Sequence, residues 1–436
     1  MKTVTIETKC GKVTGELREG ARIFKGIPYA TAERFERPVQ ITHWEGTLDA
    51  TAEPLEAMQR DAFLEPDYDF YRKEFRADSS FRYAENPITL TVISPENAKN
   101  SPVMIFIHGG AFFTGWQSSV PSGCTLEYAK RGIVFVSISY RLNVFSLYDQ
   151  KNLHLYDQLE AIKWVQRNIS DYGGDGSSIT LVGQSAGAMS IFELMYTDCL
   201  KGLVNRAVMM SGAGFFPSFG DGYSPAEARP FWDEVMREAG ASSEEELKEV
   251  PAEKLWRAWK KVKGKQKGFH MDQPGADGSM IPCRPSEIRK SGKLLDIPVI
   301  IGVTGQDMIL PLVMYFINRN FALWSARRNR SPVYAYYFDN VPPGNSYRSF
   351  HASDLWYMFG CMEKSSRPFT DSDRALSREM IDSVAGFVKT GEAPWEAFTL
   401  KNRKFRVFNT RGRKYGGLLY ALPELIHNTL FERGPF

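Results

Sequence analysis

A serine between two glycines is the feature of this sequence that points most directly to chemistry. Residues 183–187 read GQSAG, which places Ser185 at the centre of a G-x-S-x-G motif. A β-branched run precedes the motif, and an Ala/Met/Ile segment that suits a helix follows it. A strand, a sharp turn and a helix form the context of a nucleophile elbow, which exposes a serine hydroxyl at the top of a sheet. The alternative for so short a motif is an ordinary glycine-rich loop.

A second glycine motif occurs earlier in the chain and also follows an apolar run. Residues 103–107 (VMIFI) are typical of a buried strand, and residues 108–112 (HGGAF) come directly after them. A loop of this HGGG type supplies backbone N–H groups to an oxyanion hole, where each donor stabilises the transition state by about 3–4 kcal/mol. Together the two motifs predict a nucleophilic serine beside an oxyanion hole. The residues expected to form that hole are Gly109, Gly110, Ala111 and Ala186.

The elements that would position both motifs alternate between strands and helices. Residues 155–169 carry apolar side chains at helical period on one face, which predicts an amphipathic helix. Residues 3–29 are β-rich and punctuated by glycines, which is typical of antiparallel hairpins. This order predicts an α/β fold with one mostly parallel, doubly wound sheet and antiparallel strands at its N-terminus. Buried strands are expected at residues 103–107, 133–138, 179–182, 207–210, 298–302 and 333–338.

Composition and charge exclude several classes of partner. Apolar residues make up 43% of the 436 residues and charged residues 24%, which is typical of a globular protein with a large core. A net charge of +3 gives no sign of a nucleic-acid surface. The chain shows neither a signal peptide nor an apolar run of transmembrane length, so we expect a cytoplasmic protein that does not bind membranes. The five cysteines lack metal-ligand spacing, which favours packed, reduced thiols.

The chain resembles the type-B carboxylesterases, the cholinesterase-like branch of the α/β-hydrolases, over nearly its whole length. The resemblance implies an α/β-hydrolase fold and hydrolysis of carboxylic esters through an acyl-enzyme, without a metal or cofactor. Besides the two motifs above, the matching segments are residues 24–30 (FKGIPYA), 157–158 (DQ), 164–169 (WVQRNI), 172–175 (YGGD), 210–212 (MSG) and 351–355 (HASDL).

The resemblance also indicates which of the six histidines acts as the base. His351 matches the catalytic histidine of the family and follows the strand expected at residues 333–338. His108 belongs to the oxyanion loop, where we expect it to shape the backbone. The remaining histidines have no motif context and are expected to be surface or structural residues; they are His43, His154, His270 and His427.

The catalytic acid is predicted by the same resemblance. Type-B esterases usually carry a glutamate shortly after a strand that ends in glycine, and Asp307 stands at that place. The order Ser185, Asp307, His351 is the order of nucleophile, acid and base in α/β-hydrolases. Met308 replaces the glycine that follows the acid in the family. Asp354 is the alternative acid, although its place just after His351 favours a cap on the following helix.

Three departures from the family bear on the shape of the site and on the charge of its substrates. The segment between Asp307 and His351 is short, and the part before His108 is compressed, so we expect an altered mouth of the site. Gln184 stands where most members carry a glutamate, which argues against cationic substrates such as choline esters. Arg141 and Asn143 lie in a run that resembles a structural segment of the family, and we expect both to be scaffold.

Residues 215–294 interrupt the strand pattern, and their middle, residues 242–267, is rich in Glu and Lys. This charge could form a basic binding patch, but solvated helix faces are the favoured interpretation. By analogy with α/β-hydrolases we expect a cap-like helical insertion within a single domain of residues 1–436. Aromatic residues near the motifs predict an apolar acyl or aryl pocket, with core packing as the alternative. They are Phe112, Phe113, Phe215 and Phe216.

We therefore expect a small-molecule ester with an apolar or aromatic part as substrate, and a monomer or homodimer. An amidase, thioesterase or lactonase on the same site is the first alternative. Esters, amides, thioesters and lactones all react through the same kind of tetrahedral intermediate and differ in the group that leaves. A non-catalytic binding protein is the second alternative. Such members of the superfamily typically lack part of the triad or the oxyanion loop, and this sequence contains both.

Overall fold

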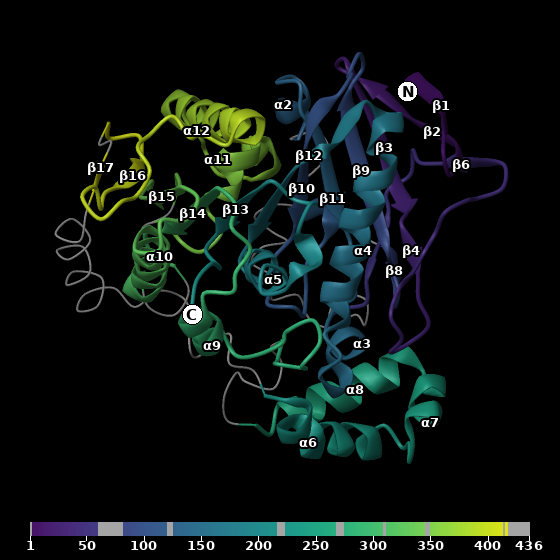
Figure 1. The fold of residues 1–436 in the computed structure, drawn as a ribbon. Coiled ribbons are helices and arrows are strands. Elements are labelled where there is room, and N and C mark those ends of the chain that lie inside the picture. The colour runs from purple at the N-terminus through teal and green to yellow at the C-terminus, as the bar shows by residue number, and fades with distance from the viewer. Residues whose placement is uncertain are drawn as a thin grey trace.

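The computed structural model describes residues 2–59, 82–119, 125–215, 223–266, 274–307, 311–344, 349–412 and 415–416, the side chains of residues 311, 312, 415 and 416 excepted (Figure 1). Within these residues one large sheet runs across the molecule. Its strands follow the order β1-β2-β3-β9-β11-β10-β12-β13-β14-β15-β16-β17, and β6 pairs with β2.

The N-terminal part of the sheet is antiparallel, as the glycine-punctuated β-rich sequence predicts. Each of its strands runs antiparallel to its neighbours in the order above, and the last of them, β9, pairs with β11. These strands are β1 (Lys2–Thr8), β2 (Gly11–Arg18), β3 (Ala21–Pro28) and β9 (Thr89–Pro95). Shorter strands accompany them: β4 (Ala30–Thr31), β5 (Val39–Gln40), β6 (Thr47–Asp49), β7 (Leu55–Ala57) and β8 (Arg82–Ala84).

The central strands pair in parallel, and their middle residues are buried on both faces, which is why most of their sequences contain apolar runs. They are β10 (Ser101–Ile107), β11 (Val134–Ile138), β12 (Gly174–Gln184), β13 (Arg206–Met210), β14 (Val299–Thr304), β15 (Val333–Phe338) and β16 (Phe405–Phe408). The last strand, β17 (Tyr415–Gly416), is antiparallel to β16. The prediction of a mostly parallel sheet with N-terminal antiparallel strands is confirmed.

Helices cover both faces of the sheet and close two separate hydrophobic cores. Successive residues of β10 alternate between them: Val103 and Ile105 join one core, whereas Met104 and Phe106 join the other. The first core includes residues of α4 (Leu153–Asn168), α5 (Ala186–Leu194), α9 (Pro285–Ser291) and α10 (Pro311–Ala326). The second includes residues of α2 (Leu126–Ala129), α11 (Leu355–Phe359) and α12 (Asp371–Thr390).

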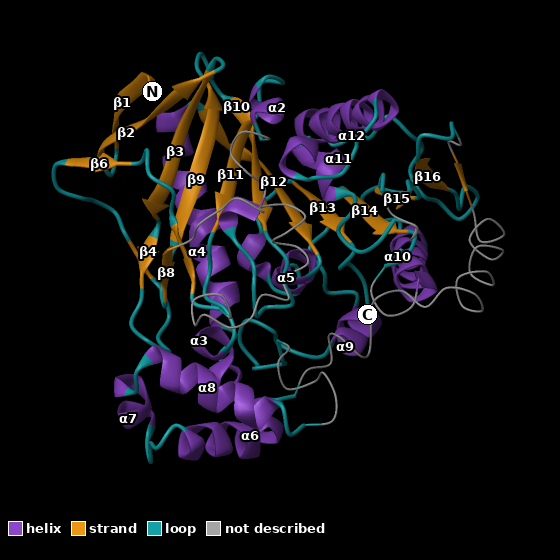
Figure 2. Cartoon of the chain, turned by 180° about the vertical axis from the view of Figure 1, so that it is seen from behind, coloured by secondary structure: helices purple, strands orange, loops and turns teal. Residues whose placement is uncertain are grey.

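A third core belongs to three helices that lie together at one end of the molecule (Figures 1 and 2). We call them the helical segment: α6 (Pro225–Glu238), α7 (Glu244–Glu249) and α8 (Ala252–Lys263). Their apolar faces pack with α3 (Val144–Leu147), with Phe112, which follows the predicted oxyanion loop, and with Ala186, which is expected in the oxyanion hole. Short 3-10 turns complete the chain: η2 (Gln117–Ser119), η3 (Tyr148–Gln150), η4 (Ile169–Tyr172), η5 (Asp198–Leu200) and η7 (Cys361–Lys364).

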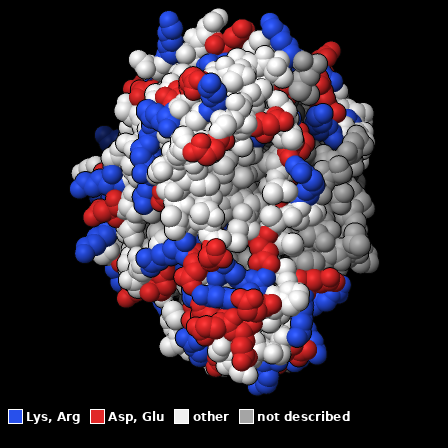
Figure 3. Space-filling model, turned by 90° about the vertical axis from the view of Figure 1, so that its right-hand side faces the viewer, with Lys and Arg blue, Asp and Glu red and all other residues white. Residues whose placement is uncertain are grey.

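The charged residues of the helical segment lie on solvated helix faces, the interpretation that the sequence favoured. Figure 3 shows acidic and basic side chains intermixed at this end of the molecule. Lys261 lies 2.5 Å from Glu238, and Lys265 lies 2.8 Å from Glu234. These two lysines are thus paired with acids, and on the face drawn in Figure 3 the charges of the described residues are mixed in sign. Among the residues that the structure describes, no helix combines the length and the apolar character needed to cross a membrane.

Candidate active site

Ser185 occupies a sharp turn between β12, which ends at Gln184, and α5, which begins at Ala186. Its backbone has φ 54° and ψ −123°, a conformation that L-residues rarely adopt. The Ser185 N–H donates to the Met210 carbonyl at 2.8 Å, and the Ser185 carbonyl accepts from Met189 N–H at 2.9 Å. The strand, turn and helix expected around the G-x-S-x-G motif are therefore present.

The two glycines of the motif are required by close backbone contacts. A Cβ at Gly183 would lie 2.5 Å from the backbone of Gly187, and a Cβ at Gly187 would lie 2.1 Å from the Ile107 carbonyl oxygen. Both distances are far below van der Waals contact. The turn can therefore form only with glycine at positions 183 and 187.

The predicted oxyanion loop passes directly against this turn. A Cβ at Gly109 would lie 2.6 Å from Gln184 Oε1 and 3.0 Å from Ser185 Cβ. Gly110 has φ 116°, and the following Ala111 has φ 54°, so this stretch of backbone turns sharply beside the elbow. Both loop segments that carry the expected donors, residues 109–111 and Ala186, thus lie near Ser185.

Asn143 and Gln59 hold the oxyanion loop with their side chains, and no catalytic motif includes either residue. Asn143 is fully buried, and its Nδ2 donates to the Met58 carbonyl at 2.8 Å and to the Phe113 carbonyl at 3.3 Å. Gln59 donates to the Gly115 carbonyl at 3.0 Å and accepts from Gly115 N–H at 3.1 Å. Asn143 fits the scaffold role expected for it, and Gln59 belongs to no motif.

His351 and Asp307 meet at the carboxyl ends of neighbouring strands. Asp307 lies just after β14, and His351 lies in the loop between β15 and α11. His351 Nδ1 donates to Asp307 Oδ1, whose carboxylate is fully buried and also accepts from Thr304 N–H at 3.2 Å. In a neutral ring whose proton is on Nδ1, Nε2 is a hydrogen-bond acceptor. Gln184, the neighbour of Ser185, donates from Nε2 to this atom at 3.2 Å.

Ser349 ties the loop of the acid to the loop of the base, and no sequence signal pointed to it. Its Oγ accepts from Gly305 N–H at 2.7 Å and donates to the Phe338 carbonyl at 2.8 Å. Its carbonyl accepts from Gln306 N–H at 2.7 Å. The backbone that precedes Asp307 is therefore fastened to the backbone that precedes His351.

Asp354 is not a helix cap, so this expectation from the sequence is wrong. It stands at the N-cap position of α11 but makes no capping hydrogen bond, because its carboxyl group accepts from the Tyr336 hydroxyl at 2.8 Å instead. The pKa of Asp354 is raised to about 7, chiefly by burial and also by nearby Asp307, against the lowering effects of Tyr336 and His351. The carboxylate that contacts Nδ1 of His351 is that of Asp307.

The other described histidines have structural or surface positions. Burial lowers the pKa of His108 to about 4, and its neutral ring stacks on Tyr140 at 4.3 Å with Nδ1 2.8 Å from the Gly109 carbonyl. Burial also lowers the pKa of His154 to about 3, and its Nδ1 lies 2.9 Å from Ser146 Oγ. His43 is exposed beside Glu45. The predictions for two more lie outside the described residues: His270 and His427.

Three of the four aromatic residues expected in the pocket are described, and Phe216 lies outside the described residues, as does Met308. Phe112 is 1% exposed and packs in the core of the helical segment. Phe113 is half-buried and lies 5.6 Å from the Trp259 ring of α8. Phe215 packs 4.9 Å from the Trp324 ring of α10. As pocket walls, these residues remain predictions.

The buried ion pair of Arg141 and Asp157 supports the fold beside the site. Both side chains have no exposed surface, and two contacts join them, at 2.6 and 2.8 Å. Arg141 also donates to the Glu36 carbonyl at 2.7 Å. These contacts give Arg141 the scaffold role expected from the sequence. In the described part of the chain, no group of three or more His, Cys, Asp or Glu residues could hold a metal ion.

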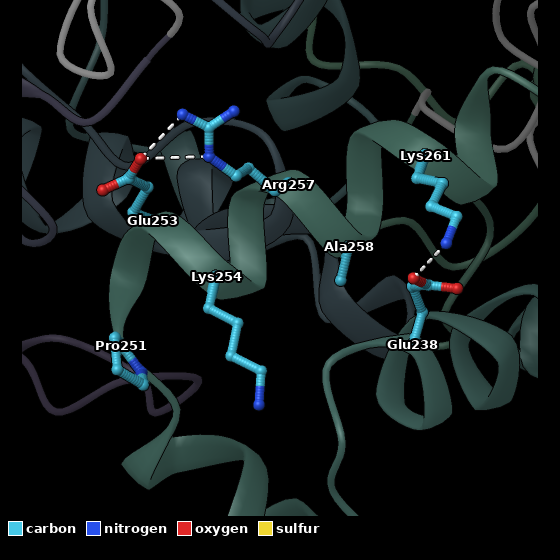
Figure 4. Close-up of a pocket in the computed structure, with 7 residues that line it drawn as sticks. All are labelled: Glu238, Pro251, Glu253, Lys254, Arg257, Ala258 and Lys261. Carbon is cyan, nitrogen blue, oxygen red and sulfur yellow. Dashed lines mark hydrogen bonds and ion pairs between the residues drawn. The ribbon is translucent and has the colours of Figure 1, made fainter.

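A surface pocket of about 390 Å³ lies on the helical segment (Figure 4). Two of its cations are paired with acids, Arg257 with Glu253 at 2.7 Å and Lys261 with Glu238 at 2.5 Å. The pocket contains none of the predicted catalytic residues, since its lining consists of Glu238, Pro251, Glu253, Lys254, Arg257, Ala258 and Lys261.

Comparison with known proteins gives consistent results over the whole chain. The model of the carboxylesterase family matches residues 2–326 and 314–420. The para-nitrobenzyl esterase of Bacillus subtilis is 29% identical over 461 aligned residues, which cover 90% of this chain and 91% of that protein. These matches extend well beyond the two motifs, from the antiparallel N-terminal strands to the end of the sheet.

Solved structures give the same result. A thermophilic PNB esterase superposes with a TM-score of 0.80 at 25% identity, covering 94% of this chain and 96% of that one. A Geobacillus stearothermophilus carboxylesterase superposes with a TM-score of 0.75 at 26% identity. The superposition covers 97% of this chain and 99% of that one. The fold is that of the α/β-hydrolases, and the chain belongs to the carboxylesterase family, as a carboxylic ester hydrolase.

Proposed function

We propose that this enzyme hydrolyses carboxylic esters through an acyl-enzyme on Ser185. The observation that supports this proposal most is the arrangement of His351, whose Nδ1 donates to buried Asp307 while Nε2 reaches the residue next to Ser185. A serine hydroxyl is a weak nucleophile that needs such an oriented base. The strained turn and the closely packed oxyanion loop give Ser185 the surroundings that acyl transfer requires.

In the proposed first half-reaction, Ser185 Oγ attacks the ester carbonyl carbon while Nε2 of His351 takes the hydroxyl proton. Asp307 keeps the imidazole in the correct tautomer and stabilises the imidazolium that forms. The N–H groups of Gly110, Ala111 and Ala186 stabilise the oxyanion, and Gly109 lets the loop approach. When the tetrahedral intermediate collapses, the C–O bond to the leaving alcohol breaks and His351 gives that alcohol its proton.

In the second half-reaction water takes the place of the serine hydroxyl. His351 removes a proton from water, the resulting oxygen attacks the acyl carbonyl, and the same N–H groups stabilise the second oxyanion. The bond to Ser185 Oγ then breaks, Oγ recovers its proton from His351, and the carboxylic acid leaves. Every proton transfer runs through Nε2, so the steps need only residues of this chain and water.

The substrate we propose is a small-molecule ester with an apolar or aromatic part. Phe113 and Phe215 are half-buried aromatic residues near the oxyanion loop and after β13, and such side chains suit an apolar acyl or alcohol group. We also propose that the helical segment acts as a cap, because its core includes Phe112, which follows the oxyanion loop, and Ala186, one of the proposed oxyanion donors.

The test is a series of p-nitrophenyl esters, from acetate to decanoate, with matched amides, thioesters and lactones. We expect esters to give the highest kcat/KM, and the optimal chain length to report the size of the acyl pocket. Ser185→Ala should retain only the residual rate that binding and the oxyanion hole provide. A higher kcat/KM for the amide, thioester or lactone series would favour that alternative, and unchanged turnover in Ser185→Ala would refute the serine mechanism.

A further inference from the structure

Gln184 contacts the predicted base, and the mechanism above gives it no role. It is the last residue of β12 and pairs with Met210 of β13, so its backbone is fixed by the sheet. The side chain is 4% exposed, and its Nε2 lies 3.2 Å from Nε2 of His351. The amide therefore lies against the one ring nitrogen that must exchange protons with the substrate.

The same amide also faces the oxyanion loop. A Cβ added at Gly109 would lie only 2.6 Å from Oε1 of Gln184. One side chain thus contacts the base with its nitrogen and borders the oxyanion loop with its oxygen. Since both contacts involve buried groups, the position of the Gln184 amide and the position of the imidazole depend on each other.

An amide suits this position because it can both donate and accept. In the resting site Nδ1 holds its proton toward Asp307, so the Gln184 N–H donates to the lone pair of Nε2. Once Nε2 carries a proton, rotation of the amide turns Oε1 toward it as an acceptor. A carboxylate could only accept and would favour the imidazolium through its charge, whereas a thioether would do neither with useful strength.

We infer that Gln184 is a positioning residue for the general base, which holds the His351 imidazole beside Ser185 in both protonation states without adding a charge. The inference rests on the proposed function of His351 as the base. Among the described residues, the titratable groups that face this histidine from the surrounding elements are Asp307 after β14, Asp354 before α11, and Tyr336 of β15 through its bond to Asp354.

The test compares Gln184→Glu and Gln184→Met with the wild type in pH profiles of kcat/KM for p-nitrophenyl acetate. For Gln184→Glu we expect the acidic limb to move to higher pH by about one unit, hence a loss of about tenfold below that limb, because a nearby carboxylate favours the imidazolium. For Gln184→Met we expect kcat to fall about 3- to 10-fold with KM changed less than about twofold. The limb of this variant should stay near that of the wild type.

Gln166→Glu is the matched control, because it makes the same chemical change on an exposed position of α4 and should leave the profile unchanged. Near-ultraviolet circular dichroism shows whether each variant is folded. An unmoved limb in folded Gln184→Glu, or an undiminished kcat in Gln184→Met, would overturn the inference. Either result leaves the proposed function standing as long as Ser185→Ala is inactive, so the two failures can be told apart.

Discussion

Ser185 is held in a conformation that costs an L-residue of the order of 1–3 kcal/mol, so its neighbours must compensate for that strain. Backbone hydrogen bonds to Met210 and Met189 fix the turn, and the absence of side chains at Gly183 and Gly187 leaves room for it. Across the turn, Gly109 makes the closest approach of the oxyanion loop. A single added Cβ atom at Gly109, Gly183 or Gly187 would therefore disturb the turn at Ser185.

Replacing Gly109 by alanine tests how close this approach is. The new Cβ would lie 2.6 Å from Gln184 Oε1 and 2.7 Å from the Gln184 carbonyl oxygen, so the loop or the elbow must move. Loss of oxyanion donors costs about 10²- to 10³-fold in kcat, and we expect a loss in this range. Gly386→Ala, in an open position of α12, is the control and should keep full activity. An active Gly109→Ala enzyme would show that the loop has more freedom than these contacts allow.

Glu193 of α5 makes the stability of the protein depend on pH. It is 4% exposed, and burial raises its pKa to about 8, with a further contribution from Asp277. The unfolded chain releases this proton near the ordinary value of about 4.5, whereas the folded chain keeps it up to about pH 8. The free energy of unfolding therefore falls as pH rises from about 4.5 to about 8. Below about pH 4.5 the carboxyl group is protonated in both states, so its contribution no longer changes with pH.

Glu193→Gln should remove this dependence. We expect its Tm to match that of the wild type near pH 4.5 and to exceed it by a few degrees at pH 8, as measured by thermal denaturation across this range. Glu249→Gln, at an exposed residue of α7, provides the comparison and should show no such trend. A Tm difference that stays constant with pH would mean that Glu193 is charged in the folded protein.

At the scale of elements, the catalytic geometry depends on how neighbouring strand ends are joined. Parallel strands place their carboxyl ends at one edge of the sheet, where ligands and catalytic groups of α/β folds gather. The loops after β14 and β15 meet there through Ser349, which bonds to both Gly305 and the Phe338 carbonyl. The buried Ser349 hydroxyl thus joins the loop that carries Asp307 to the loop that carries His351.

Ser349→Ala should loosen this connection. The substitution leaves a buried N–H and a buried carbonyl without their partner, which costs about 1–3 kcal/mol of stability. Because the backbone before Asp307 and His351 then shifts, we also expect kcat to fall more than KM rises. Steady-state kinetics with thermal denaturation measure both effects. Ser383→Ala, which removes a bond to the Glu379 carbonyl within α12, should leave kcat unchanged, and equal kinetics for the two variants would contradict the role of Ser349.

The sequence predicts the elements better than the contacts between them. The apolar runs located β10, β11, β13, β14 and β15 closely, and helical period located α4 at Leu153–Asn168 against the expected 155–169. These signals are local, since burial on both faces dictates the residue types. The cap expected at Asp354 failed because Tyr336, on a different strand, takes its carboxyl group. The contacts of Ser349 and Gln184 likewise join distant segments, and no local pattern encodes them.

At the scale of the whole molecule, two hydrophobic cores lie on the two faces of the sheet, and a third core joins the helical segment to Phe112 and Ala186. Lys263 of α8 places its ammonium group 3.3 Å from the ring centre of Phe113, and Trp259 packs on the same ring. The helical segment is thereby docked on the loop that carries the expected oxyanion donors. Cation–π and aromatic contacts of this kind contribute about 0.5–2 kcal/mol each.

The measurement that tests the central claim most directly is covalent trapping of the nucleophile in the full chain. Diethyl p-nitrophenyl phosphate transfers its phosphoryl group to an activated serine and releases p-nitrophenol, and the resulting ester resists hydrolysis. Our account predicts one adduct per chain, located on Ser185 by tandem mass spectrometry and formed in step with the loss of esterase activity. An adduct on another residue, or full esterase activity after Ser185 is modified, would contradict it.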